Sequence, residues 1–163
     1  MRRITVLLAV AVATSLTAAA TLARAAAPGQ ASISIDETFT QSFCGFPIQE
    51  HDVLTLKFAT WTDATGAPTR QLVTAPGARI TWTNLATGAS VSSPNPFAVH
   101  KRFNADGSVT IALTGLNFVI RGGGRVYVDS GRELLVFANG SVQPVAGSGP
   151  SDDLCEALRA AIG

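Results

Sequence analysis

The sequence has 163 residues, with 12 lysines and arginines against 11 aspartates and glutamates and a formal net charge of +1. Three of the arginines lie in the first 25 residues, so the chain that follows has nine cations against 11 carboxylates and a net charge of −2. Neither sign forms a run in the sequence, which does not indicate steering toward nucleic acid or an anionic membrane. We expect no nucleic-acid partner.

The N-terminus has the three parts of a secretory signal peptide. A pair of arginines precedes an apolar run over residues 4–16, and Ala23-Arg24-Ala25 supplies a small-residue cleavage site. We expect residues 1–25 to be removed and residues 26–163 to form a single secreted domain, extracellular or associated with the cell envelope. The alternatives are a membrane anchor built on the same apolar run and export by the twin-arginine route.

Two cysteines, Cys44 and Cys155, lie near opposite ends of the expected mature chain. An exported protein enters a compartment in which disulfides form and persist, so we predict a Cys44–Cys155 bond. Neither cysteine has a second Cys or His at the spacing of metal ligands. We therefore expect no metal site, and no cofactor is indicated.

From Ser32 onward the sequence predicts short strands divided by turns. Period-two alternation is clear in residues 54–59 and 108–114, and Gly- and Asn-rich turn signals separate such runs. Residues 96–145 are predicted to form a meander of five or six strands, with Ser130-Gly131 as one of its turns. Gly115 is either another turn or a bend in one long strand. Earlier strands are predicted near residues 32–39, 44–49, 53–61, 70–74, 78–84 and 90–92.

The last element, residues 151–162, is predicted to be a helix. Ser151 is a suitable N-cap, and the two aspartates after it place negative charge in the first turn. Cys155 belongs to the apolar face of this helix, so the disulfide would tie the helix to the first core strand. The predicted fold class is all-β, an antiparallel sandwich or a small barrel with a C-terminal helix tied on by a disulfide.

Five short motifs follow one another along the expected mature chain: Cys44-Gly45-Phe46-Pro47, Thr83-Asn84-Leu85-Ala86-Thr87-Gly88, Asp106-Gly107-Ser108-Val109-Thr110, Asp129-Ser130-Gly131-Arg132 and Asp153-Leu154-Cys155. Taken together, they resemble a group of uncharacterised small secreted β-rich proteins of actinobacteria. The resemblance implies secretion, an all-β domain and paired cysteines. No activity is assigned to that group, so the resemblance implies no catalytic residue.

Glu50-His51-Asp52 is the densest cluster of titratable residues. We interpret these residues as a polar turn between two strands, with all three side chains in water. The alternative is one continuous strand through residues 44–58. Glu50 and Asp52 would then share a face with apolar residues and could carry raised pKa values, as acid/base sites do.

The two tryptophans differ in their predicted surroundings. Trp82 alternates in phase with Ile80, which places it in the core. Trp61 is in phase with Lys57 and Ala59 and opposite to the apolar residues of its strand, so we expect it near solvent at a strand end. An exposed indole can stack on a sugar or anchor a partner protein. The alternative for Trp61 is a packing role.

We expect a non-enzymatic domain that binds a small molecule, a glycan or a protein partner. Trp61, His51, Glu50 and Asp52 are the candidate binding residues. No serine lies in a nucleophile-elbow setting, and both cysteines are committed to the predicted disulfide. The alternatives are a hydrolase-like enzyme with a site around Glu50, His51 and Asp52, and a structural envelope protein without a specific ligand.

Overall fold

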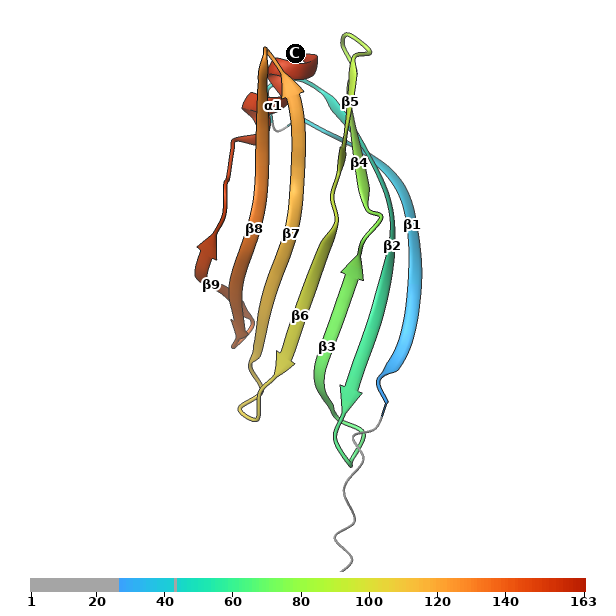
Figure 1. The fold of residues 1–163 in the computed structure, drawn as a ribbon, viewed down its shortest axis with the longest axis vertical. Helices are drawn as coiled ribbons and strands as arrows, with labels where there is room; N and C mark the ends of the chain where they lie inside the picture. Colours follow the sequence, from blue (N-terminus) through green and yellow to red (C-terminus); the bar gives the residue numbers. More distant parts are fainter. Residues whose placement is uncertain (1–26, 43) are drawn as a thin grey trace, which may run out of the picture.

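A computed structural model describes residues 27–42 and 44–163, so the predicted signal peptide over residues 1–25 lies outside the described residues. Nine strands and one helix follow each other along this part of the chain (Figure 1). They are β1 (Gly29–Gln41), β2 (Ile48–Thr62), β3 (Pro68–Ala75), β4 (Arg79–Asn84), β5 (Ser90–Pro94), β6 (Phe97–Phe103), β7 (Val109–Gly122), β8 (Arg125–Ala138), β9 (Ser141–Ser148) and α1 (Leu154–Ile162). Within the described residues, no helix has the length and apolarity needed to cross a membrane.

All nine strands belong to one antiparallel sheet, which confirms the predicted all-β class. The hydrogen-bonded order is β5-β4-β2-β3-β6-β7-β8-β9, and β1 pairs with the other edge of β2. With 15 residues, β2 is long enough to pair with two strands on one edge: its first six residues pair with β4 and its last six with β3. The sequence left a sandwich and a barrel open. The structure has a single sheet in which β1, β5 and β9 each pair with only one other strand.

Because successive strand residues point to opposite sides, the register defines two faces of the sheet. Face A carries the even-numbered residues of β2, and face B carries the odd-numbered ones. The helix α1 contacts β4, β5, β7 and β8 at the upper end of the molecule, on face A (Figure 1). We call the part of the sheet beside α1 the upper half. The lower half begins at the row Phe97–Gly115–Gly131 and extends away from α1.

The hydrophobic core lies between α1 and the upper half of face A. Trp82 is buried there, as predicted, together with apolar residues of β2, β7 and β8. At the helix C-terminus, Asn84 Nδ2 donates a hydrogen bond of 2.9 Å to the backbone oxygen of Ile162. The core residues that pack on Trp82 or around it are Cys44, Ile48, Phe118, Ile120, Tyr127, Ala157, Leu158 and Ile162.

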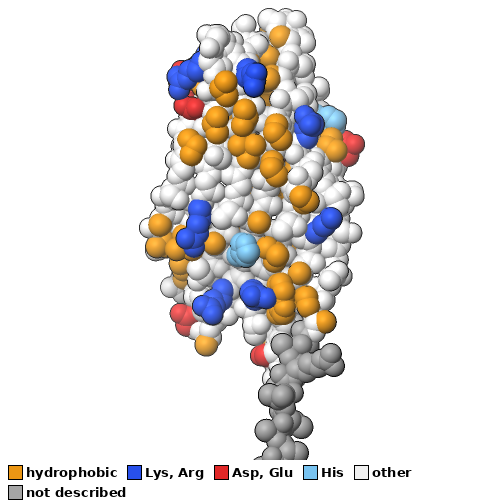
Figure 2. All heavy atoms as spheres, viewed as in Figure 1, with side chains coloured by type: hydrophobic (Ala, Val, Ile, Leu, Met, Phe, Trp, Pro, Cys, Tyr) orange, Lys and Arg blue, Asp and Glu red, His pale blue; other side chains and the backbone are white. Residues whose placement is uncertain are grey.

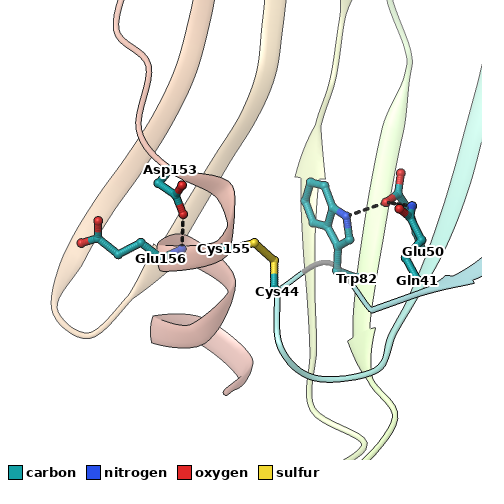
Figure 3. Close-up of a disulfide and its surroundings, with 7 residues drawn as sticks. All are labelled: Gln41, Cys44, Glu50, Trp82, Asp153, Cys155 and Glu156. Atoms are coloured by element: carbon teal, nitrogen blue, oxygen red, sulfur yellow. Dashed lines mark hydrogen bonds between the residues drawn. A yellow bond between two sulfur atoms is a disulfide. The ribbon is translucent and has the colours of Figure 1, made fainter.

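The predicted disulfide is present and links α1 to the connection between β1 and β2. Cys44 and Cys155 are bonded across a sequence separation of 111 residues (Figure 3). The predicted N-cap is wrong: α1 begins after Asp153, whose side chain accepts a hydrogen bond from the backbone N–H of Glu156. Ser151 instead forms an isolated bridge with Asp129 of β8, so the chain is still extended at that residue.

Two predicted turns are continuous strand. Residues 50–52 lie inside β2, because β1 pairs with them along one edge and β4 along the other. Ser130-Gly131 lies inside β8, where Gly131 has a φ of +145° and a Cβ would overlap the carbonyl oxygen of Ser148. This glycine permits a close approach of two strands. Gly115 lies inside one long strand, β7, so the meander predicted to begin at residue 96 contains four strands in place of the predicted five or six.

Candidate functional site

The structure separates the three residues of the Glu50-His51-Asp52 cluster. They occupy successive positions of β2, so Glu50 and Asp52 point to face A and His51 points to face B. The continuous-strand interpretation holds from Ile48 onward, although residues 44–47 are not part of the strand, and the predicted polar turn was wrong. A hydrolase-like site would need all three groups around one substrate, and this strand places the imidazole on the far side of the sheet from both carboxylates.

Glu50 is held by two side chains from other strands. Trp82 Nε1 and Gln41 Nε2 both donate to Glu50 Oε2, at 3.1 and 3.0 Å (Figure 3). Burial raises the pKa of the Glu50 carboxyl above its ordinary value of 4.5, the Trp82 hydrogen bond opposes that rise, and the charge of Asp52 adds to it. The carboxyl group thus serves as the acceptor that allows an indole N–H to be buried.

Asp52 lies two residues further along the same face. Its Oδ1 atom is buried and has no hydrogen-bond partner among the described residues. Desolvation by burial raises the pKa of Asp52 above 3.8, His51 lowers it, and the neighbouring Glu37 raises it. His51 itself forms a hydrogen bond with Asp36 on face B, with 2.8 Å between Nε2 and Oδ1.

A hollow of about 540 Å³ opens on face A below the first turn of α1. Its carboxylates already have partners: Asp129 accepts from Asn117, and Asp152 binds Arg125 and the backbone N–H of Val128. No group of three or more His, Cys, Asp or Glu residues that could hold a metal ion occurs within the described ranges. Asp152 thus joins the segment before α1 to β8, and Asp129 joins β8 to β7. Glu50 is the one predicted site residue in the lining.

Trp61 lies one residue before the end of β2 on face B, in the phase that the sequence predicted. It is half-buried, and the guanidinium of Arg70 lies over its ring at 3.8 Å from the centroid. Arg102 is directly opposite Arg70 on the adjacent strand β6. The row Trp61–Arg70–Arg102 therefore places an indole and two guanidinium groups side by side.

Charge is segregated between the two faces, which the sequence analysis missed. Among the described residues, face B carries six Lys and Arg side chains and one carboxylate, Asp36, a net charge of +5. Face A together with the segment from Asp152 through α1 carries eight carboxylates and three cations, a net charge of −5. The remaining two carboxylates lie in turns. The six cations of face B are Lys57, Arg70, Arg79, Arg102, Arg121 and Arg132.

Figure 2 shows face B, since both histidines of the chain are visible and both belong to it. Most of the blue side chains lie over the interior of this face, whereas the red ones lie at its rim. We call the cations of its lower half, with the histidine among them, the basic patch: Lys57, Arg70, His100, Arg102 and Arg132. Arg125 is the one Lys or Arg of the described residues that forms an ion pair, so the patch has no internal counter-charge.

Between these cations the surface of face B is built from small and aliphatic side chains. Ala59, Leu72, Ala112 and Leu134 all belong to the same row of the sheet as His100. The sequence does contain a signal for the patch, because the position of each cation in the alternation of its strand decides which face it lies on. That position predicts the face only when the strand is known to be continuous.

Comparisons with known proteins found no match: no protein-family model, no curated protein and no solved structure matches the chain.

Proposed function

We propose that this protein is exported and acts by binding an acidic glycan, one that carries carboxylates or phosphates, across the basic patch of face B. The observation that carries the proposal is the segregation of six of the nine described cations onto one face with a single carboxylate. Export is supported by the signal-peptide pattern of residues 1–25 and is compatible with the Cys44–Cys155 disulfide.

The arrangement of Arg70 and Arg102 supports an anionic ligand. Like charges directly opposite each other on neighbouring strands destabilise a sheet, and these two have no carboxylate partner among the described side chains. An anion between them would offset that repulsion. Guanidinium groups bind carboxylate and phosphate oxygens in bidentate geometry, so the pair suits either anion.

A glycan fits this face better than nucleic acid or a membrane. Proteins that bind single-stranded nucleic acid offer several aromatic rings on which bases stack, whereas Trp61 is the one tryptophan, tyrosine or phenylalanine in the described lower half of face B. The aliphatic residues between the cations, Leu72 and Leu134 among alanines, are half-buried and belong to a flat strand row, whereas membrane-surface binding uses large apolar side chains that project into the lipid. Instead, the Arg70 guanidinium, which lies over the Trp61 ring, and Arg102 opposite it offer two anchors for the acidic groups of a polysaccharide.

The test compares two variants that lose the same charge from opposite faces. Arg70→Gln/Arg102→Gln removes two cations from the basic patch, and Lys101→Gln/Arg159→Gln removes two from face A and α1. Binding to polygalacturonate is measured by calorimetry at several salt concentrations, with neutral dextran as the reference polymer. We expect salt-dependent binding of polygalacturonate by the wild type. The affinity should fall at least about 10-fold in the first variant and stay near that of the wild type in the second.

Three results would overturn the proposal. Equal losses in the two variants would mean that net charge, and no particular face, governs binding. Binding to dextran as strong as to polygalacturonate would remove the role of the anion. Tighter binding to single-stranded DNA or to phosphatidylglycerol vesicles than to any acidic polysaccharide, at the same salt concentration, would identify a different class of ligand.

A further inference from the structure

The lower half of face A is apolar and has no second layer over it within the described residues. Its side chains come from β2, β6, β7 and β8, and α1 contacts only the upper half. Phe137 on this face is 40 % exposed, and Val142 and Ile33 at its two sides are each 55 % exposed. We call this surface the apolar half-face; its central residues are Phe58, Val99, Ile111, Leu113, Leu135 and Phe137.

A sheet face of this kind needs a covering layer. Domains are built from at least two packed layers, and a contiguous apolar surface left open to water marks an interaction site. Seven strands cross the lower half, and β6 contributes seven residues to it. At about 4.8 Å per strand and 3.3 Å per residue, the apolar half-face covers about 650 Å².

The size of this surface favours a protein occupant over a small one. Two such surfaces packed together would bury about 1,300 Å², which falls in the range of specific protein–protein interfaces. One small apolar molecule would leave most of the half-face in water. The half-face is also electrically balanced, since Lys101 and Glu133 are its only charged strand residues among those described. A second copy of the same surface therefore meets no net repulsion.

The position of α1 fits a second copy. A helix is about 10 Å across, and two stacked sheets lie about 10 Å apart, so α1 occupies the depth that a facing sheet would need. Two copies can then face each other only with their helices at opposite ends, each beyond the lower end of the other sheet. We propose that the protein forms a symmetric dimer in which the apolar half-faces of two copies pack together in this antiparallel arrangement.

The experiment measures the oligomeric state of the disulfide-bonded protein by sedimentation over a range of concentrations up to about 100 µM. We expect a dimer. Val99→Lys places an ammonium group in the centre of the interface, directly opposite Val73 and Leu113. It should weaken dimerisation at least about 100-fold, because that charge would be buried without a carboxylate on either neighbouring strand to pair with it. Leu134→Lys is the matched control, since Leu134 is likewise a half-buried aliphatic residue but belongs to face B.

A second variant guards against a fold defect in the first. Phe137→Lys alters a side chain that is already 40 % exposed, and it should also give a folded monomer by circular dichroism and sedimentation. The proposal is overturned if wild type stays monomeric at the highest concentration. It is equally overturned if Leu134→Lys dissociates the dimer as strongly as Val99→Lys, or if native mass spectrometry finds each copy alone with an apolar small molecule that Val99→Lys releases. Loss of glycan binding with dimerisation intact would contradict only the proposed function.

Discussion

Removal of the Cys44–Cys155 disulfide should cost this protein a large share of its stability. The bond closes a loop with a sequence separation of 111 residues, and the chain-entropy relation then gives about 5 kcal/mol at 25 °C. Whole domains of this size have unfolding free energies of only about 5–15 kcal/mol. We therefore expect the Cys44→Ala/Cys155→Ala variant to be marginally folded, with α1 as the first element to separate from the sheet.

Urea unfolding followed by tryptophan fluorescence is a suitable assay, because Trp82 is buried in the core that α1 covers. The variant should unfold at a much lower urea concentration. It should also show a larger dependence of the unfolding free energy on urea, since its unfolded chain is less compact. The same measurement on wild type in dithiothreitol separates the covalent link from the packing of the two side chains, and dithiothreitol should not affect the variant.

A stability loss below about 1 kcal/mol in both the variant and reduced wild type would refute this reasoning. It would mean that the contacts of Leu158, Ile162 and Asn84 hold α1 in place without the disulfide and that the unfolded chain keeps its ends together. A large loss in the variant alone would assign the effect to the cavity left by Cys44, which is only 4 % exposed.

Two further predictions concern the sheet. The raised pKa values of Glu50 and Asp52 mean that their protonated forms stabilise the fold at low pH; this contribution is lost as the pH rises from about 4 through the raised values. The stability of Glu50→Gln/Asp52→Asn relative to wild type should therefore increase over that range in denaturation at a series of pH values; a constant difference would contradict the assignment. Gly131→Ala should destabilise the protein by about 2 kcal/mol, because its methyl group would overlap the Ser148 carbonyl oxygen. Gly147→Ala, where a Cβ has room, is its control in thermal melts, and equal melting temperatures for the two variants would contradict the prediction.

Local patterns predicted the parts of the fold that depend on local chemistry. The helical spacing of apolar residues predicted α1, the alternation around Trp82 predicted its burial, and the position of Cys155 on the apolar face predicted which side of α1 the disulfide would use. Each of these inferences needed only neighbouring residues. The N-cap was misplaced by two residues because the bridge between Ser151 and Asp129 keeps the chain extended, and Asp129 lies 22 positions earlier in the sequence.

The errors arose where distant residues decide the local structure. Three polar residues in a row favour a turn, yet Glu50 lies inside a strand because Trp82 and Gln41 donate hydrogen bonds to its carboxylate. To predict the charge segregation from the sequence, one would need still more information about distant residues. The face of every cation depends on uninterrupted strand phase, and a bulge between Leu116 and Phe118 shifts that phase in β7. Residue spacing alone does not reveal such a shift.

The separation of charge across the sheet makes each subunit an electric dipole directed along the normal of the sheet. Net charges of +5 and −5 at a distance of about 10 Å correspond to a moment on the order of 200 debye, against about 3.5 debye for one peptide unit. A single subunit near an anionic surface would rotate until face B arrives first, most strongly at low ionic strength. In the proposed dimer the two moments point in opposite directions and cancel. Dielectric relaxation would therefore distinguish the two forms, and the dimer would approach such a surface equally well from either side.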